Sequence, residues 1–349
     1  MNNYQLHTGD CLAILPTLPD NSVDLILTDP PYYKVKGDAW DRQWATATEY
    51  LAWLDKVLAE FARVLRPNGS LYLFASPQMA ARVECLVGTR FAVLNRITWR
   101  KAEGRHKAAC KAELRSFFPA SEAIIFAEHL GADNIAKGEA GYGAKCDELR
   151  GFIFEPLRKY LDDERERAGF DRRMCDKVCG NQMSGHYFSR VQWTLPTRSN
   201  YEKLRAAFNS QTMPEYDHLK RKYDVLKVEY DDLKVEYESL RRPFQVTADV
   251  PYTDVWDFPT VSHYKGKHPC EKPQDLLRHI ITASSKPDAV VLDAFMGSGS
   301  TGKATLALGR AFIGIELDPA WVAKVEELTA IRVALTKAGI PESRDGQKR

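Results

Sequence analysis

The chain has 349 residues, 44% of them hydrophobic, and its 49 basic and 47 acidic residues give a formal net charge of +2. No window approaches the roughly 18 uninterrupted apolar residues of a membrane-spanning helix, and the first residues lack the basic start and apolar core of a signal peptide. Seven cysteines without a Cys-x-x-Cys pair argue against a zinc ribbon and a disulfide framework. We therefore expect a cytoplasmic protein with free thiols, no membrane partner and no metal.

The first hundred residues alternate short β-like runs with helical stretches. Apolar residues predict strands at 4–7, 23–28, 70–75 and 90–100. Residues 47–66 place a row of large apolar side chains on one helical face, and Pro67-Asn68-Gly69 then indicates a helix stop. Strands that alternate with helices in this way predict a parallel α/β sheet.

Residues 101–262 lose this alternation and contain one long helix, expected over 215–241. Two residue types recur in it every seven positions, at Tyr216, Tyr223, Tyr230 and Tyr237 and at Leu219, Leu226, Leu233 and Leu240. Tyrosine at a and leucine at d can form the seam of a coiled coil. The stripe predicts self-association as a homodimer, a helix pair within the chain, or packing of the helix on its own domain.

Residues 263–335 return to the α/β pattern. A helix is expected at 273–285, a strand at 289–293, a helix at 300–309, a strand at 311–315 and a helix at 319–334. A polar tail follows. The simplest architecture is one α/β domain built from both ends of the chain, with the middle segment inserted.

A glycine-rich loop over 293–304 joins a predicted strand to a predicted helix. Its glycines at 297, 299 and 302 fit Gly-x-Gly-x-x-Gly, and Glu316 ends the next strand, where an acid can hold a ribose diol. The string also fits most of a P-loop, but Ala304 replaces the hydroxyl that binds Mg²⁺. The loop alone indicates an adenosine-type ligand. It also leaves open an NAD-dependent dehydrogenase or a purely structural turn.

The tetrapeptide Asp29-Pro30-Pro31-Tyr32 directly follows the strand at 23–28. Open α/β sheets bind ligands at the carboxyl ends of their strands, and two consecutive prolines stiffen the backbone there. An acid, a fixed carbonyl oxygen and an aromatic ring then project from one point. This set suits a planar amine, because Asp29 and the Pro30 carbonyl can accept its two N–H bonds while Tyr32 stacks on its ring.

Together, Asp-Pro-Pro-Tyr and Asp293-x-Phe295-x-Gly297-Ser-Gly resemble the signature of the amino-group DNA methyltransferases, which use S-adenosylmethionine. The order of the two motifs resembles the β-group, and the Tyr/Leu heptads resemble those of prophage-type adenine methyltransferases. The resemblance implies a seven-stranded Rossmann-like methyltransferase sheet with helices on both faces, plus an inserted, mainly helical DNA-recognition region. The catalytic domain would comprise 1–130 and 251–335, the insertion 131–250 and a polar tail 336–349.

The resemblance also assigns roles to individual residues. It makes Asp29, Pro30, Pro31 and Tyr32 catalytic. It assigns cofactor binding to Asp10, Cys11, Asp29, Lys272, Asp293, Phe295, Gly297, Ser298, Gly299, Ser300, Thr301 and Glu316. Glu316 would hold the ribose, and Asp10 with Cys11 would contact the cofactor's adenine. Double-stranded DNA is the implied substrate, from which the target base is flipped out because its amino group is otherwise paired.

DNA contacts are expected from three segments. The loop after the tetrapeptide contributes Lys34 and Lys36, and the basic segment 101–115 contributes Arg105, Lys107, Lys111 and Arg115, unless it is only a solvated charged loop. A helix over 171–179, a glycine turn and a second helix over 181–193 resemble a helix-turn-helix. The second helix would present Gln182, Ser184, His186, Ser189, Arg190 and Gln192 to base edges.

The sequence therefore predicts a site-specific DNA methyltransferase that acts on adenine N6. Asp in front of Pro-Pro-Tyr favours adenine, and cytosine N4 is the alternative within the class. A repressor-like DNA-binding module is an alternative of another class, supported by 170–204 and the heptads. It leaves the two strand-end motifs without a purpose.

Overall fold

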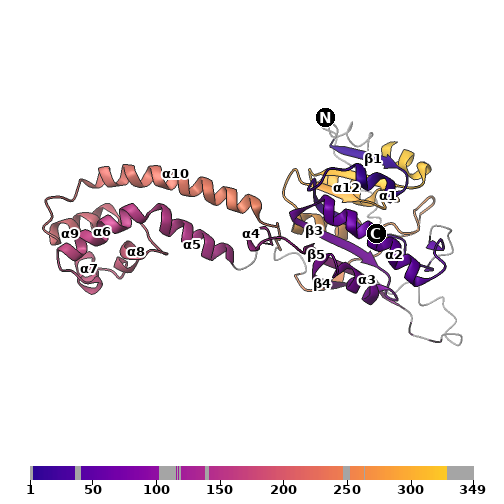
Figure 1. Cartoon of the computed structure of the whole chain (residues 1–349), viewed down its shortest axis with the longest axis horizontal. Helices are drawn as coiled ribbons and strands as arrows, with labels where there is room; N and C mark the ends of the chain where they lie inside the picture. The colour runs from indigo at the N-terminus through magenta and orange to yellow at the C-terminus, as the bar shows by residue number, and fades with distance from the viewer. Residues whose placement is uncertain are drawn as a thin grey trace, which may run out of the picture. The chain divides into compact units, whose positions relative to one another are not determined.

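A computed structural model of the chain describes residues 3–35, 41–101, 115, 117, 119–137, 141–246, 252–262 and 264–327. The chain forms two compact units (Figure 1), Met1–Lys137 with Arg242–Arg349 and, between them, Gly138–Arg241. The inserted unit is thus shorter at both ends than the predicted 131–250. The predicted tail at 336–349 lies outside the described residues. No described helix is long and apolar enough to cross a bilayer.

The first unit is built on a mixed sheet with the order β1-β8-β7-β2-β3-β5-β4-β6. Its strands are β1 (Tyr4–Thr8), β2 (Val23–Thr28), β3 (Leu65–Ala75), β4 (Phe91–Arg100), β5 (Ser121–His129), β6 (Val255–Asp257), β7 (Val290–Asp293) and β8 (Ala311–Glu316). β5 runs antiparallel to β3 and β4, and the other neighbouring pairs are parallel. The predicted α/β class is confirmed.

The predicted number of seven strands is wrong, because the described residues form eight. The additional strand is β6, which pairs with the end of β4 from Thr98 to Arg100. Its central residue, Trp256, buries its ring, whereas the flanking residues are exposed. Three residues with one buried side chain are too short to show a strand period.

Helices cover both faces of the sheet, as predicted. Side chains alternate along the strands, so Ile26 and Leu71 face α1 (Cys11–Ile14), α2 (Ala47–Val64) and α3 (Ala80–Val87) in one apolar core. Leu25 and Tyr72 face the second core, which includes α11 (Gln274–Ser284) and α12 (Ser300–Ala307). A further helix over 319–327 packs Val322 and Val325 against Phe312.

The helix expected over 47–66 ends two residues earlier than predicted, and Pro67-Asn68-Gly69 lie within the next strand. α2 ends at Val64, and β3 begins at Leu65. The pairing of β2 with β3 jumps from Val23–Leu65 to Leu25–Ser70. The three residues therefore form an irregularity within the strand, a position that tolerates a proline without an N–H group.

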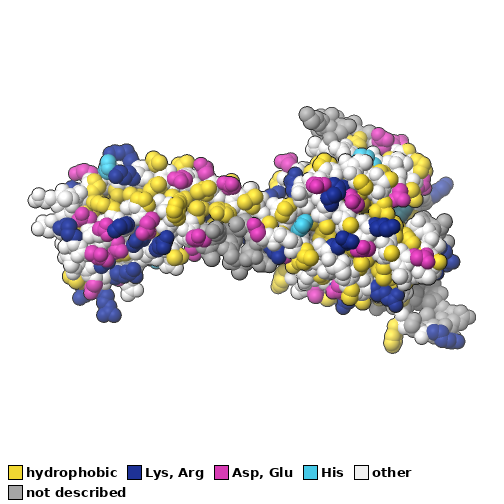
Figure 2. Space-filling view, in the orientation of Figure 1, with side chains coloured by type: hydrophobic (Ala, Val, Ile, Leu, Met, Phe, Trp, Pro, Cys, Tyr) yellow, Lys and Arg dark blue, Asp and Glu magenta, His cyan; other side chains and the backbone are white. Residues whose placement is uncertain are grey.

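The inserted unit is helical. It contains α5 (Gly141–Ile153), α6 (Glu155–Arg167), α7 (Arg172–Cys179), α8 (Ser184–Phe188), α9 (Arg198–Ala207) and α10 (Tyr216–Leu240). Leu219 and Tyr230 of α10 are buried in the core of this unit, and Tyr223 and Leu226 pack against it. Most of the heptad stripe thus packs on its own domain, one of the alternatives that the sequence left open, whereas Leu240 at its end is exposed. Figure 2 shows hydrophobic side chains gathered along α10, where Val225, Val228 and Val235 are exposed.

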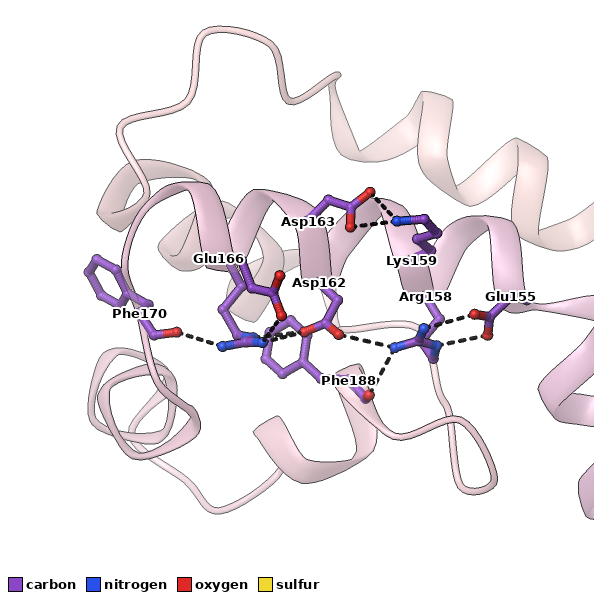
Figure 3. A network of polar contacts seen from close by, with 9 residues as sticks. Glu155, Arg158, Lys159, Asp162, Asp163, Glu166, Phe170 and Phe188 are labelled. Atoms are coloured by element: carbon purple, nitrogen blue, oxygen red, sulfur yellow. Dashed lines mark hydrogen bonds and ion pairs between the residues drawn. The ribbon is translucent and has the colours of Figure 1, made fainter.

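The polar side of α6 is tied to neighbouring segments by arginines. Figure 3 shows Arg158 between Glu155 and Asp162, with a further hydrogen bond to the Phe188 carbonyl oxygen. Arg165 likewise joins Asp162 to the carbonyl oxygen of Phe170. These contacts connect α6 to the end of α8 and to the segment that precedes α7.

The second helix expected over 181–193 is present only as the short α8. α8 ends at Phe188, and Ser189 is extended. On a continued helix, Trp193 would lie about 140° around the axis from Phe188. Both rings are buried in the same core, so the chain leaves the helix to bring Trp193 inward. The Thr194 N–H donates to the His186 carbonyl oxygen at 3.1 Å and closes this turn.

The chain leaves and re-enters the first unit at neighbouring points. The Arg242 N–H donates to the Ala136 carbonyl oxygen at 2.6 Å. The Arg242 guanidinium pairs with Glu128 of β5 at 2.7 Å, and both side chains are almost fully buried. The Arg242 guanidinium also lies over the ring of Phe126. The two ends of the inserted segment are therefore fastened together at the sheet.

Candidate active site

A cavity of about 1170 Å³ lies at the edge of the sheet where the parallel strands end. Because β5 is antiparallel, its first residues reach the same edge. Most predicted catalytic and cofactor residues line the cavity: Asp10, Cys11, Asp29, Pro30, Pro31, Tyr32, Lys272, Asp293, Phe295, Gly297, Ser298, Ser300, Thr301 and Glu316. Gly299 belongs to the same loop. The residues of both motifs thus share one cavity within the first unit.

A hydrogen-bonded cluster joins the ends of the neighbouring strands β2 and β7. The Thr28 hydroxyl donates to Asp293 Oδ1 at 2.7 Å and accepts the Ala294 N–H at 3.1 Å. The same oxygen of Asp293 accepts the Phe295 N–H at 3.1 Å. Burial raises the pKa of Asp293 to about 6. This cluster fixes the position of the tetrapeptide relative to the glycine loop.

The glycine loop turns through left-handed backbone conformations. Gly297 has φ +50° and Gly299 has φ +73°. Glu316 holds the turn through both of its oxygens, which accept the N–H groups of Gly297 at 2.8 Å and Asp318 at 3.0 Å. A Cβ at Gly297 would lie 2.9 Å from Cε1 of His268. Glycine is required here for conformation and for space.

Alanine at Gly299 should destabilise the protein more than alanine at Gly309. Both glycines have nearly the same φ, +73° and +74°, so each substitution should cost about 1–2 kcal/mol in backbone strain. At Gly299 the new Cβ would also lie 2.7 Å from both methyl groups of Val325, whereas nothing lies within 4 Å at Gly309. Thermal unfolding measures both variants. Equal losses would show that the contact with Val325 relaxes freely.

Asp10 and Cys11, which also line the cavity, lie at the start of α1. The Asp10 side chain caps this helix by accepting the Leu12 N–H at 2.8 Å. Cys11 is buried, and burial together with the neighbouring Asp10 raises the pKa of its thiol to about 12. Cys11 is therefore a neutral, apolar part of the wall rather than a reactive thiolate.

Asp29 belongs to a buried group of charges that sequence analysis did not find. Lys272 Nζ donates to Asp29 Oδ2 and lies 3.5 Å from Glu122 Oε2. Lys101 Nζ donates to the other oxygen of Glu122. The Tyr32 hydroxyl donates to Glu122 at 3.4 Å. Two carboxylates and two ammonium groups thus surround the base of the tetrapeptide, with a net charge of zero.

The charges in this group control one another's protonation. Burial raises the pKa of Asp29, Lys272 opposes this rise and Glu122 adds to it. Burial would lower the pKa of Lys272, but Asp29 and Glu122 outweigh it and raise that pKa. Burial likewise would raise the pKa of Glu122, but Lys272 and Lys101 lower it. Lys272 is therefore a permanent cation between two acids.

The second oxygen of Asp29, Oδ1, is buried and has no hydrogen-bond partner among the described residues. Asp41 fixes the backbone that follows Asp29. Its carboxylate accepts the Tyr32 N–H at 2.7 Å, and its main-chain carbonyl oxygen accepts the Lys34 N–H at 2.8 Å. Tyr33 and Lys34 both have positive φ, a strained conformation for residues other than glycine. The chain thus holds an unpaired acceptor at the cavity wall.

The predicted DNA contacts fall into two groups. Lys36, Arg105, Lys107 and Lys111 lie outside the described residues. Lys34 donates to the Ala45 carbonyl oxygen at 2.7 Å, and Arg115 is exposed. In the inserted unit, Gln182, Arg190 and Gln192 are exposed, and His186 and Ser189 are half-buried. Ser184 is buried and donates to the Arg172 carbonyl oxygen at 2.9 Å, so we no longer propose that it contacts a base.

Residues 23–327 match the N6/N4 DNA methylase family. The chain belongs to this family. It is 25% identical over 318 residues to the DNA adenine methyltransferase YhdJ of Escherichia coli K12, covering 90% of this chain and 78% of that protein. It is 24% identical over 332 residues to the type II methyltransferase M2.MboI of Moraxella bovis, covering 90% and 83%. The family that the motifs suggested is confirmed.

This methylase also shares its fold with a solved cytosine-N4 enzyme. The PvuII DNA methyltransferase superposes with a TM-score of 0.50, at 14% identity, over 97% of this chain and 94% of the other. Such a likeness is one of fold alone. Among the described residues of this methylase, no group of three potential metal ligands occurs.

Proposed function

We propose that this DNA methylase transfers a methyl group from S-adenosylmethionine to the N6 amino group of adenines flipped out of double-stranded DNA, at specific sites. The observation that carries the proposal is Asp29, which lines the same cavity as the glycine loop and whose buried Oδ1 has no hydrogen-bond partner among the described residues. The amino group would donate one hydrogen to this oxygen and the other to the Pro30 carbonyl oxygen.

The residues of the cavity fit the methyl donor. Among the described residues, eight Asp and Glu side chains and three Lys side chains line it, an acidic excess that suits a cationic sulfonium. Residues of the glycine loop line the cavity, and each Glu316 oxygen has a lone pair left for a ribose hydroxyl. When bound, the sulfonium supplies an electrophilic methyl group.

The protein's part in the reaction is positioning. Adenine N6 is a weak nucleophile because its lone pair is delocalised into the ring. Hydrogen bonds from both amino hydrogens to fixed acceptors would localise that pair and orient it. Asp29 can do this only as a carboxylate, and the ammonium of Lys272 on Oδ2 opposes its protonation. The proton can leave N6 after transfer, so Asp29 need not act as a base.

The target base must leave the duplex to reach this depth. Extrusion of a base costs a few kcal/mol, and stacking on Tyr32 would return about 1–3 kcal/mol. Lys34, Arg115 and the basic segment 101–115, most of which lies outside the described residues, would bind phosphates of the DNA. This DNA substrate also supports our expectation of a cytoplasmic enzyme.

Adenine is favoured over cytosine by two observations. The acid in the tetrapeptide is Asp29, the residue type typical of adenine enzymes, and the 25% identical relative is named a DNA adenine methyltransferase. The same two acceptors could hold the N4 amino group of cytosine, which remains the alternative.

One assay tests the activity and its target together. The protein is incubated with duplex DNA and methyl-labelled S-adenosylmethionine, and the DNA is digested to nucleosides. Label in N6-methyldeoxyadenosine is expected. Label in N4-methyldeoxycytidine would select the alternative, and tight DNA binding without label would indicate a repressor-like module. Sequencing of the methylated bases would then show whether the enzyme is site-specific.

We also propose that the protein forms a homodimer through the exposed side of α10. Most heptad side chains pack on their own unit, and the exposed apolar surface that we assign to a second copy carries Val225, Val228 and Val235. Replacement of Val228 and Val235 with lysine should convert dimers to monomers in sedimentation velocity while unfolding stays unchanged. A wild-type protein that sediments as a monomer would refute the dimer.

A further inference from the structure

The inserted unit contains a second cavity, of about 320 Å³, that the proposed reaction does not use. Its walls come from α5, from Phe154 between α5 and α6, from the first part of α8, from α10 and from the irregular segment between α8 and α9. Gly151 of α5 permits this arrangement, because a Cβ there would lie 3.0 Å from the Arg190 carbonyl oxygen. The volume is at the lower end of the range for small-ligand sites.

Aromatic rings form much of the cavity wall. Phe154 stacks on Trp193 with centroids 5.2 Å apart and on Tyr223 at 5.4 Å, in both cases with an interplanar angle of 25°. Phe154 and Trp193 are buried, and Tyr223 is the more accessible ring. A flat ring that entered the cavity could continue this stack on Tyr223.

The polar groups of the cavity call for an anionic ligand with hydrogen-bond acceptors. Trp193 Nε1 is buried and has no partner among the described residues. Arg150 and Lys227 line the cavity, and no Asp or Glu of the described residues does. Asp147 lies 3.5 Å from Arg150, and Asp231 pairs with Lys227 at 2.5 Å. Neither acid lines the cavity itself. Gln192 adds a side-chain amide that can both donate and accept hydrogen bonds.

We propose that this cavity binds one nucleotide of the DNA strand, displaced from the duplex, with its base on Tyr223 and its phosphate between Arg150 and Lys227. A flat heteroaromatic ring with acceptor atoms and an attached anion matches every group described above. The DNA source rests on the proposed function. A free nucleoside monophosphate has the same chemistry and is the other source that the test must separate.

The first test is photocrosslinking of the full-length protein to duplex DNA that carries 5-iododeoxyuridine at successive positions. A crosslink to Trp193 or Tyr223, found by mass spectrometry of the peptides, is expected at one or a few positions. The four deoxynucleoside monophosphates, titrated alone by calorimetry, form the second arm. Binding of monophosphates without any crosslink from DNA would overturn the DNA source, and the absence of both would overturn the site.

Variants test the contribution of each wall by DNA binding in fluorescence anisotropy. Tyr223→Ala should weaken affinity at least about fivefold, as expected for one lost base stack, and Tyr223→Phe should restore it. Lys227→Ala should reduce the slope of log K against log salt by about one. The matched control is Lys159→Ala, because Lys159 also pairs with an aspartate four residues on, Asp163 (Figure 3), outside the cavity.

These experiments distinguish a failure of the nucleotide site from a failure of the proposed methyl transfer. Lys227 is an exposed surface residue, so its variant remains informative even if Tyr223→Ala fails to fold. Equal effects of Lys227→Ala and Lys159→Ala would contradict the proposal. Normal methyl transfer without crosslinks would refute the nucleotide site alone, whereas crosslinks without methyl transfer would refute the proposed function alone.

Discussion

Replacement of Asp29 with alanine should lower the rate of methyl transfer at least about 10²–10³-fold, the loss typical of removing one fixed group that stabilises a transition state. The substitution removes the only acceptor that we assign to a side chain at the target amine. Affinity for S-adenosylmethionine should stay within several-fold, because the glycine loop and Glu316 are unchanged. Single-turnover methylation of duplex DNA and equilibrium cofactor binding measure the two effects.

The structure indicates that this variant will fold. Lys272 keeps Glu122 as a partner 3.5 Å away, so no lysine is left buried without a counter-charge. Asp257→Ala is the control, because that carboxylate pairs with Arg100 at the exposed edge of the sheet. Turnover of Asp29→Ala equal to that of Asp257→Ala would rule out the proposed role of Asp29.

Replacement of Lys272 with methionine should shift the acid limb of kcat/KM to higher pH and destabilise the protein. The pKa of Lys272 is raised, so the wild-type ammonium is charged throughout the neutral range. Without it, the pKa of Asp29 rises further, and the active carboxylate forms only at higher pH. Loss of one partner of a buried pair typically costs about 3–5 kcal/mol.

The sign of the stability change follows from linkage. An acid whose pKa is higher in the folded than in the unfolded state binds protons on folding, so its contribution to stability falls as pH rises through that interval. Lys272→Met should therefore lose most stability at neutral and alkaline pH and recover part of it towards acid pH. Denaturant unfolding across the pH range measures this dependence.

Glu122→Gln should move the acid limb in the opposite direction. Glu122 raises the pKa of Asp29, so its neutralisation leaves Lys272 to Asp29 alone and lowers that pKa. Lys267→Met is the control, because Lys267 lines the same cavity but donates to the Val261 carbonyl oxygen. If Lys272→Met instead weakened cofactor binding without moving the acid limb, Lys272 would serve the cofactor, as the sequence first suggested.

The meeting of the two motifs could be foreseen from the sequence, and the group of charges could not. Asp29 follows the parallel strand β2, and Asp293 is the last residue of the parallel strand β7. The carboxyl ends of parallel strands share one edge of the sheet. Glu122 is the second residue of an antiparallel strand. Its position at the same edge follows only from knowing that β5 reverses direction, since Ala75 at the end of β3 pairs with Ala123.

The inserted unit was harder to predict for a different reason. The Asp176 carboxylate accepts the Ser184 N–H at 3.1 Å where α8 begins, a contact between residues eight positions apart that no local pattern shows. The heptad pattern was real, but a stripe of tyrosine and leucine is equally apolar towards a partner chain and towards its own domain. Only the positions of Phe154 and Trp193 decide between them.

The hydrogen bond between Arg242 and Ala136 has a consequence for how such a protein can evolve. The hundred or so residues between Ala136 and Arg242 form one insertion between two neighbouring points of the first unit. The strand register and the glycine loop are formed by residues before and after this insertion, so they do not depend on its size. Recombination at these two points could exchange the inserted unit for another one while leaving the residues of the large cavity in place. Under the proposed role of this unit in DNA recognition, enzymes with new target sequences would arise by grafting rather than by gradual remodelling of a shared core.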